Sequence, residues 1–419
     1  MNILVKKSDI QGNIRVIPSK SYAHRILILS ALGNSTVTVN NLIYSKDILA
    51  TINALVSLGA KIDLLGDSVK VEPIVVDSEQ KSVFCDESGS TLRFLLPIIS
   101  ALGLTATVDG KQGLRNRPIK LLLDILREHG VIVSADSLPL TLSGKLKAGT
   151  FVIDGSQSSQ NLTGLMIALS LLDEPSEIII KNGLVSVGYI DITLEVMKLF
   201  GANIVKTEEG FIVNPATFSV QDNISVEGDY SSASFLLALG ALCGDIAISG
   251  LKLDSNQGDR AIVDILAKMG ADISAGDTIT VKKSNLKAID IVATDIPDLI
   301  PIIAVCCSRA KGVSSIKGVD RLKIKESDRL LAVCDMLTDF GVIHYYAKDT
   351  LYIYGGTQKA PTRPIKGYND HRIVMSASVM AVALGQGEIT DCEAISKSYP
   401  NFFEDLKVLG GDEIAQVLG

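Results

Sequence analysis

One phrase recurs six times along this chain and limits the folds that it can adopt. An apolar helical end is followed by Gly and then by two short strands, as in LVSLGAKIDLLGDSVKVEP and LTDFGVIHYYAKDTLYIYG. The glycines are spaced by 71, 71, 69, 71 and 69 residues, and they are Gly59, Gly130, Gly201, Gly270, Gly341 and Gly410. A Gly directly after a helix is the expected left-handed C-cap. The spacing predicts a structural repeat, whose sixth copy is cut short at LKVLGGDEIAQVLG.

A second phrase lies half a repeat earlier, where a helix runs into a strand, as in ISALGLTATVDG and LGALCGDIAISGL. Each repeat therefore reads strand–helix–strand–helix–strand–strand, which predicts α/β sheets with helices packed against them. A chain of 419 residues is too long to fold around one ordinary hydrophobic core. The repeats are also longer than solenoid units of about 20–50 residues, so we predict two compact domains of three repeats each. The polar segment 214–229 is a candidate hinge between them.

Composition excludes several classes of function. The net charge of −7 argues against a nucleic-acid partner, which usually calls for a basic face. Six cysteines without a CxxC pair, four histidines and no HExxH motif predict reduced thiols and no metal site. The start MNILVKKSDIQ lacks the apolar region of a signal peptide, and apolar stretches end before the roughly 18–20 residues of a membrane helix. We therefore expect a cytoplasmic protein without a membrane partner.

The starts of the repeated helices carry the unusual chemistry. Ser, Asp and Asn at these starts are explained as N-caps. Cations are not, because a helix N-terminus is already positive. The cations at these starts are Lys20, Arg25, Arg93, Arg117, Lys325, Arg329, Arg372 and Lys397. Solvated surface charge is the ordinary interpretation of Lys and Arg, but recurrence at one structural position favours anion sites. We predict a ligand with more than one phosphate or carboxylate group.

Two acids and one histidine complete the candidate site. Asp298 follows Pro297 in DIPDLIP, and Glu326 stands among the cations of KIKESDR. A carboxylate beside fixed cations can carry a proton or serve only as an ion-pair partner, and Asp298 can also be a plain N-cap. His371 in YNDHR is the histidine that we expect to be functional, whereas the sequence assigns no role to His24.

Eight segments in order over residues 20 to 406 resemble the 5-enolpyruvylshikimate-3-phosphate synthase family. They are SKSYAHR, DGSQSSQ, VSVGYID, VEGDYSSAS, IPDL, KIKESDR, YNDHR and AISKSYPNFFEDL. The resemblance implies a two-domain inside-out α/β barrel with three βαβαββ units per domain, closing on its substrates. It implies domains 20–228 and 1–19 plus 229–419. The implied reaction transfers the enolpyruvyl group of phosphoenolpyruvate to the 5-hydroxyl of shikimate 3-phosphate, without metal or organic cofactor. We expect a monomer.

The resemblance also implies roles for individual residues. The residues implied to bind shikimate 3-phosphate are Lys20, Ser21, Arg25, Ser158, Ser159, Ser186, Tyr189, Asp298 and Lys325. The residues implied to bind phosphoenolpyruvate are Lys20, Gly89, Arg117, Gln160, Arg329, Arg372 and Lys397, with His371, Arg93 and Arg321 as further candidates. Asp298 suits the base that removes the hydroxyl proton, and Glu326 or Lys20 suits the acid that protonates C3. The cations would stabilise the departing phosphate.

The sequence departs from the family pattern at two places, and it leaves two rival functions to be considered. ESGST, residues 87–91, stands where many members read Asn-x-Gly-Thr-Ala, and Arg321 stands where many have Asn, so sensitivity to the inhibitor glyphosate is not fixed. The nearest rival is the sister enolpyruvyltransferase that acts on UDP-N-acetylglucosamine. That family carries a loop Cys, which DGKQGLRNRPI lacks. A non-catalytic binding protein for phosphorylated metabolites is the other rival, and Asp298 and Glu326 beside the cations argue against it.

Overall fold

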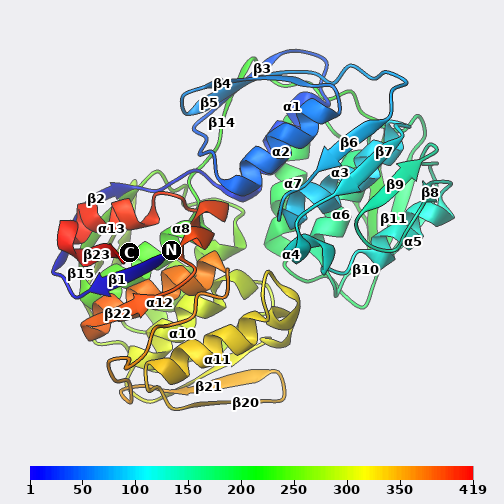
Figure 1. The fold of residues 1–419 in the computed structure, drawn as a ribbon. Coiled ribbons are helices and arrows are strands. Elements are labelled where there is room, and N and C mark those ends of the chain that lie inside the picture. Colours follow the sequence, from blue (N-terminus) through cyan, green and yellow to red (C-terminus); the bar gives the residue numbers. More distant parts are fainter. Residues whose placement is uncertain (419) are drawn as a thin grey trace. The chain divides into compact units, whose positions relative to one another are not determined.

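The computed structural model describes residues 1–418, and the chain divides into two compact units (Figure 1). One unit is Pro18–Val226, called the 18–226 unit below. The other combines Met1–Ile17 with Glu227–Gly419 and is called the split unit. Both crossings between the units come slightly earlier than expected. The 18–226 unit begins two residues before the expected position 20 and ends two residues before the expected position 228. No helix of residues 1–418 is long and apolar enough to cross a membrane.

The 18–226 unit holds three four-stranded sheets of one design. Each repeat contributes four strands, numbered here by their place in the repeat. The first strand pairs parallel with the second. The second and the third strands both pair antiparallel with the fourth, which therefore lies between them. In spatial order the strands are β14 (Asn223–Ser225), β3 (Val37–Asn40), β5 (Ser68–Glu72) and β4 (Lys61–Leu65); β6 (Lys81–Phe84), β7 (Ala106–Asp109), β9 (Leu140–Ser143) and β8 (Ile132–Val133); and β10 (Thr150–Asp154), β11 (Ser176–Lys181), β13 (Gly210–Val213) and β12 (Ile204–Lys206). The helices are α1 (Lys20–Ala31), α2 (Lys46–Ser57), α3 (Gly89–Ala101), α4 (Gln112–Arg115), α5 (Lys120–Glu128), α6 (Ser159–Leu169) and α7 (Val187–Leu199).

The split unit repeats the same design. Its sheets are, in spatial order, β2 (Ile10–Arg15), β15 (Gly244–Ser249), β17 (Thr278–Lys282) and β16 (Asp272–Ala275); β18 (Asp290–Val292), β19 (Val313–Lys317), β21 (Thr350–Tyr354) and β20 (His344–Ala347); and β22 (Gln386–Ile389), β1 (Asn2–Lys6) and β23 (Ala415–Leu418). Its α-helices are α8 (Tyr230–Cys243), α9 (Ala261–Lys268), α10 (Ile300–Arg309), α11 (Arg329–Asp339), α12 (His371–Leu384) and α13 (Phe402–Gly410). Its 3₁₀ helices are η1 (Gly258–Arg260), η2 (Pro297–Leu299), η3 (Asp320–Ile324), η4 (Cys392–Lys397) and η5 (Asp412–Ile414).

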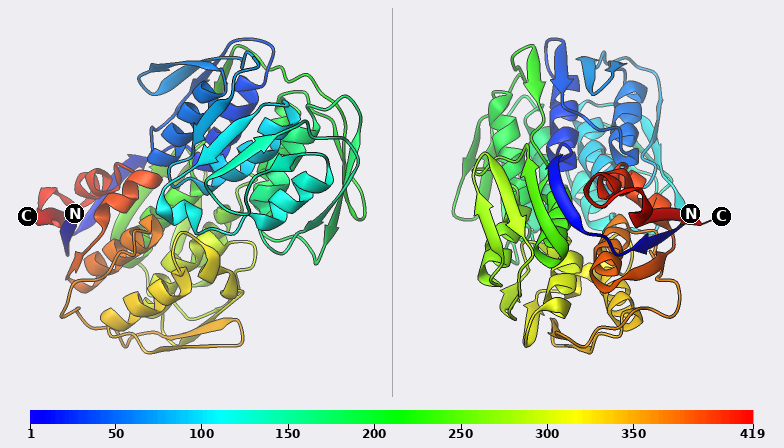
Figure 2. Two further views of the ribbon diagram at one scale, coloured as in Figure 1. Left: turned by 45° about the vertical axis from the view of Figure 1, so that its right-hand side comes forward. Right: turned by 90° about the vertical axis from the view of Figure 1, so that its left-hand side faces the viewer.

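The N-terminal strands complete repeats that lie far away in the sequence. β1 pairs antiparallel with both β22 and β23, which is the position of the fourth strand in the sixth repeat. A single parallel bridge from Ile365 to Ile389 marks the place of that repeat's first strand. Figures 1 and 2 show the blue N-terminal strand beside the red and orange C-terminal elements. The copy that looks truncated in the sequence is therefore closed by residues from the other end of the chain.

Two other repeats, the first one of each unit, also take their first strand from a distant part of the chain. β2 supplies it to the repeat of α8, and β14 supplies it to the repeat of α1. The segment 214–229 considered as a hinge thus contains a strand of the 18–226 unit, and the crossing lies between Val226 and Glu227 at its end.

The predicted helix-ending glycines are confirmed in five of six repeats. Positive φ angles between 67° and 109° are found at Gly59, Gly130, Gly201, Gly270 and Gly341. The prediction is wrong for Gly410, which is the last residue of α13. The left-handed residue there is Gly411, with φ of 83°, because a second glycine lets the helix continue for one more residue.

The first helix of each repeat is the buried one. All of α3 except Ser90 is buried, and α8 is buried from Ser232 to Leu242. A helix that is apolar on all sides belongs in a core. Four of the predicted cations, Lys20, Arg25, Arg93 and Arg372, lie in the first two turns of these buried helices, so the fold brings charge to the ends of its core helices.

Close packing of α3 on α6 depends on Gly164. A methyl group on Gly164 would lie 2.3 Å from the carbonyl oxygen of Arg93, a backbone atom that cannot rotate away. We expect Gly164→Ala to lower the free energy of unfolding by about 1–3 kcal/mol. Urea denaturation checks this, with Gly276→Ala as the control because a methyl there meets nothing closer than 3.9 Å. Equal loss in both variants would contradict the packing argument.

Candidate active site

The start of α3 is a candidate anion site in the 18–226 unit. Ser88 caps the helix by accepting a hydrogen bond from the Thr91 amide, and Gly89 is the first helical residue. A Cβ on Gly89 would lie 2.4 Å from Nη1 of Arg117 and 2.9 Å from Nη1 of Arg93. Free amides of a first turn with two guanidinium groups beside them suit a phosphate or carboxylate group. Only glycine leaves this space open.

Two of the predicted side chains, Arg93 and Gln160, are hydrogen-bonded to each other beside this helix start. Arg93 donates to the Gln160 side-chain oxygen at 3.0 Å and to the Pro118 carbonyl at 3.2 Å. Gln160 in turn donates to the Ser90 hydroxyl at 3.0 Å. The structure thus brings together Gly89, Arg117 and Gln160, all expected at phosphoenolpyruvate, with the further candidate Arg93.

Arg25 is a buried cation among neutral oxygens. It donates to Thr193 Oγ1 at 2.8 Å, Ser21 O at 2.8 Å, Tyr189 O at 2.9 Å and Thr163 Oγ1 at 3.2 Å. Its guanidinium lies 5.1 Å from the ring centre of Phe94. Burial lowers the pKa of Arg25 to about 10. Within residues 1–418 no carboxylate forms an ion pair with it, so an anionic ligand would supply the missing counter-charge.

The other residues expected at shikimate 3-phosphate in this unit lie at helix starts. Lys20 Nζ is ion-paired with Asp47 Oδ2 at 2.7 Å, so a ligand must share or replace that partner. Ser158 caps α6, and Ser159 is its buried first residue. Ser186 precedes α7 with φ of 56°, a conformation that is uncommon for a residue with a side chain. Strain of this kind is often found at functional sites.

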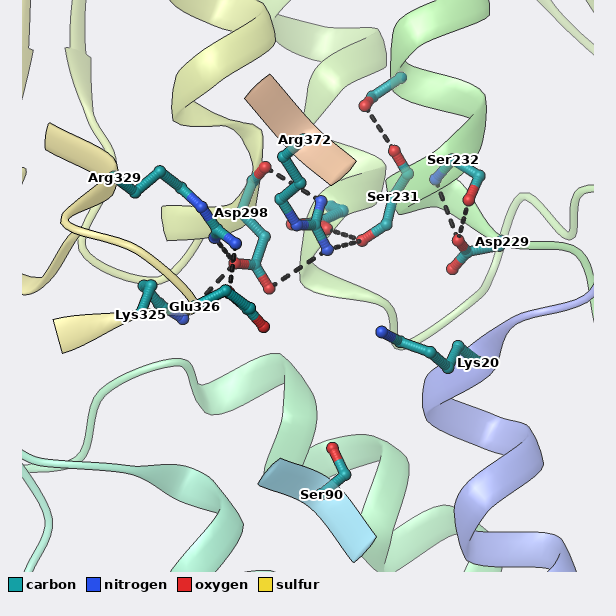
Figure 3. A network of polar contacts seen from close by, with 12 residues as sticks. Lys20, Ser90, Asp229, Ser231, Ser232, Asp298, Lys325, Glu326, Arg329 and Arg372 are labelled. Atoms are coloured by element: carbon teal, nitrogen blue, oxygen red, sulfur yellow. Dashed lines mark hydrogen bonds and ion pairs between the residues drawn. The ribbon is translucent and has the colours of Figure 1, made fainter. Parts of the chain in front are cut away.

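Asp298 is the centre of a charged cluster in the split unit (Figure 3). Its Oδ1 lies 2.9 Å from Arg329 Nη1 and 3.4 Å from Lys325 Nζ, and its Oδ2 lies 3.4 Å from Arg372 Nη2. Burial raises the pKa of this carboxyl, but Arg372, Lys325 and Arg329 together outweigh burial and hold it well below its usual range. Asp298 is therefore ionised. Its contacts with three cations go beyond those of a residue that only caps a helix.

Arg329 is fully buried and bound to three carboxylates. It contacts Asp370 at 2.8 Å, Asp298 at 2.9 Å and Glu326 at a shorter distance. The resemblance assigns Arg329 to phosphoenolpyruvate. In this structure its donors contact these three acids, so phosphoenolpyruvate would have to share Arg329 with them or replace one of them.

The remaining predicted cations surround the same cluster. Arg372 donates from Nη1 to the Asp298 carbonyl at 3.1 Å. Loss of hydration on burial lowers the pKa of Lys325, despite the nearby Asp298. Three further candidates lie in the same unit: His371, buried at the first position of α12; Lys397, which donates to the Asn369 carbonyl at 2.7 Å; and Arg321, which donates to the Thr294 carbonyl at 3.2 Å. In the part of the chain that the structure describes, no group of three His, Cys, Asp or Glu side chains is placed to hold a metal ion.

Comparison with known proteins decides the family. Residues 4–406 match the EPSP synthase family, described as 3-phosphoshikimate 1-carboxyvinyltransferase. The chain belongs to the EPSP synthase family. It is 38% identical over 424 residues to the 3-phosphoshikimate 1-carboxyvinyltransferase of Clostridium beijerinckii, with 98% of each chain covered. It is 39% identical over 413 residues to the enzyme of that name from Clostridium acetobutylicum, with 96% of each covered.

Solved structures show the same fold at lower sequence identity. The EPSP synthase of Acinetobacter baumannii superposes with a TM-score of 0.83 at 22% identity, over 100% of both chains. The enolpyruvyl transferase NikO from Streptomyces tendae does so with a TM-score of 0.78 at 17% identity, covering 99% of this chain and 98% of that one. The predicted α/β fold of the EPSP synthase family is therefore confirmed.

Two acids of this EPSP synthase family member were missed from the sequence. Asp370 caps α12 and also binds Arg329, so its ordinary capping role hid its second role. Asp259 in QGDRA is buried, accepts a hydrogen bond from Ser231 and lies close to Arg372. Both stand at helix starts, as the candidate cations do, and that shared position is the signal that could have found them.

Asp259 makes a testable contribution to stability. Burial, helped by Asp298 and opposed by Arg372, raises the pKa of Asp259 from 3.8 to about 6. The folded protein therefore binds this proton more tightly than the unfolded chain does, and stability falls as the pH rises through this interval. We expect Asp259→Asn to gain on the order of 1–3 kcal/mol relative to the native chain at pH 7 and nothing below about pH 4. Urea unfolding at several pH values checks this, and a pH-independent difference would contradict it.

Proposed function

We propose that this protein transfers the enolpyruvyl group of phosphoenolpyruvate to the 5-hydroxyl of shikimate 3-phosphate and releases phosphate. The products would be 5-enolpyruvylshikimate 3-phosphate and inorganic phosphate. The single observation that carries the proposal is the ionised Asp298 among Arg329, Lys325 and Arg372 in a chain of this family. Such a site can remove a proton and stabilise phosphate as it leaves.

We assign the substrates to the residues that the sequence comparison indicated. Shikimate 3-phosphate is assigned to Lys20, Ser21, Arg25, Ser158, Ser159, Ser186, Tyr189, Asp298 and Lys325. Phosphoenolpyruvate is assigned to Lys20, Gly89, Arg117, Gln160, Arg329, Arg372 and Lys397, with Arg93 supporting Gln160 and Arg329 also holding the acids. Support comes from the open space at Gly89 and from the lack of a carboxylate partner for Arg25 among residues 1–418.

The proposed steps conserve protons and bonds. Asp298 takes the proton of the 5-hydroxyl as that oxygen bonds to C2 of phosphoenolpyruvate, and C3 gains a proton from Glu326 or Lys20. In the tetrahedral intermediate the group that gave its proton to C3, Glu326 or Lys20, takes a proton back from C3 as the C2–C3 double bond re-forms. The C2–O bond to phosphate breaks with its electron pair on the departing phosphate, which takes the proton held by Asp298. Anionic substrates would occupy the cations that now hold the pKa of Asp298 low, so substrate binding would make this carboxylate a stronger base.

Phosphate release tests the proposed function. The protein is mixed with both substrates, and inorganic phosphate is followed, with each substrate omitted in turn as the control. We expect release only when both are present. Binding of both without release would favour the non-catalytic alternative, and release with UDP-N-acetylglucosamine in place of shikimate 3-phosphate would favour the sister enzyme, which the family match does not favour.

The proposal includes an active monomer that works in the cytoplasm. Sedimentation of the protein with and without substrates checks the first part. Turnover that appears only in a dimeric fraction would contradict it.

A further inference from the structure

His24 heads a chain of buried hydrogen bonds through three helices of the 18–226 unit. Its Nδ1 lies 2.7 Å from Thr51 Oγ1 in α2, and Thr51 Oγ1 lies 2.6 Å from Thr91 Oγ1 in α3. Thr91 donates its hydroxyl proton to Ser88 Oγ at 2.7 Å. His24 is 1% exposed and the other three residues are 0% exposed. Water therefore does not compete for these bonds.

The direction of the chain follows from its last member. A threonine hydroxyl has one proton, and Thr91 gives its proton to Ser88. Thr91 must then accept from Thr51, and Thr51 must accept from His24. This order places the imidazole proton on Nδ1. The other ring nitrogen, Nε2, is buried and has no hydrogen-bond partner.

The surroundings keep the ring neutral. Burial lowers the pKa of His24 well below its ordinary value, and the positive charges of Lys20 and Arg25 on the same helix lower it further. The groups that face the ring from α2 and α3 are Thr51 and Phe94, neither of which ionises here. A protonated ring would also need a second acceptor at Nε2, and the buried site offers none.

The chain ends where the proposed phosphoenolpyruvate site begins. Ser88 caps α3 and accepts from both the hydroxyl and the amide of Thr91. Gly89 and Ser90 follow directly, with the amides and hydroxyl that face Arg117 and Gln160. α1 meanwhile carries Lys20, Ser21 and Arg25. The chain is thus a fixed link between the helix starts assigned to the two substrates.

We propose that His24, as the neutral Nδ1–H tautomer, is a positioning residue that holds the first turn of α3 in the geometry that binds phosphoenolpyruvate. The inference rests on the proposed function for the identity of the ligand, but its hydrogen-bond order stands on the geometry alone. The imidazole acts only through Thr51 and Thr91. Its effect should therefore reach the substrate held by α3 and spare the substrate held by α1.

Two variants of nearly equal size test this role. Asparagine places an amide nitrogen where His24 has Nδ1, whereas leucine places a methyl group there. We expect His24→Asn to keep the KM for phosphoenolpyruvate within about twofold of the native value, and His24→Leu to raise it about tenfold, as for loss of a buried hydrogen bond. The KM for shikimate 3-phosphate should change by less than about twofold in both. Thr51→Val should match His24→Leu, and the double variant should add little, because both break one chain.

Ser100→Ala is the matched control, since it removes a buried hydroxyl at the far end of the same helix. An equal rise of KM in Ser100→Ala, or in His24→Asn and His24→Leu alike, would overturn the proposal. Nitrogen NMR of the native protein tests it without any variant. We expect a proton on Nδ1 and no titration between about pH 5.5 and 8, and a proton on Nε2 or a titrating ring would overturn it. Native protein that releases no phosphate would instead refute the proposed function and leave the NMR result intact.

Discussion

Asp298→Asn is expected to lower turnover by a factor of about 10² to 10⁴, the usual contribution of a positioned general base. The variant keeps the backbone carbonyl that Arg372 contacts and loses only the charge. Binding of shikimate 3-phosphate should weaken only modestly, because the ring hydroxyl can still bond to the amide. Binding of phosphoenolpyruvate should persist, because Arg372 loses a competing anion. Asp298→Ala should lose turnover in the same way.

Rapid-quench phosphate release and calorimetric titration of each substrate measure the two effects separately. Asp328→Asn is the matched control: it lies at another helix start of the same unit, is exposed, and asparagine caps α11 as aspartate does. We expect its turnover to be within about twofold of the native rate. Near-native turnover in Asp298→Asn would remove Asp298 as the base, and lost substrate binding would assign it to binding instead.

The repeat in the sequence predicted most of the fold because each copy carries its own local signals. A glycine can end a helix wherever the chain must turn left-handed, so Gly59 and Gly341 could be found without tertiary information. The strands at the N-terminus are different. The partners of β1, which are β22 and β23, lie at the other end of the chain, and no local sequence pattern predicts that pairing. Only the resemblance assigned residues 1–19 to the second domain.

For the candidate site, too, the sequence predicts local features but not tertiary contacts. Cations at helix starts are a local signal, so Arg25, Arg93 and Arg372 could be found. Which groups those cations contact depends on helices that meet only in the fold. Arg25 meets four neutral oxygens, whereas Arg329 meets three carboxylates, and nothing in the two sequence segments separates these cases. The hydrogen-bond partners of His24 lie on other helices, so no role for that histidine could be predicted from its own segment.

Arg329→Met is expected to lower the free energy of unfolding by about 3–5 kcal/mol, as happens when one partner of a buried ion pair is removed. The side chains of Arg329 and Asp370 are both 0% exposed, so the variant leaves a buried carboxylate without its cation. Turnover should also collapse, since Asp298 and Glu326 lose the group that holds them both. Urea denaturation and phosphate release measure these effects.

Arg115→Met provides the comparison, because Arg115 pairs with Asp109 on the surface at 2.6 Å, where water screens the pair, and its loss should lower stability far less. A loss in Arg329→Met no larger than this would show that the buried cluster adds nothing to stability. The double variant Arg329→Met with Asp370→Asn separates charge from packing. Asparagine still caps α12 but carries no charge, so the double variant should recover part of the lost stability. It should not recover turnover, because Asp298 would still lack its buried partner. Stability that falls further in the double variant would mean that Asp370 stabilises the fold by contacts other than the one to Arg329.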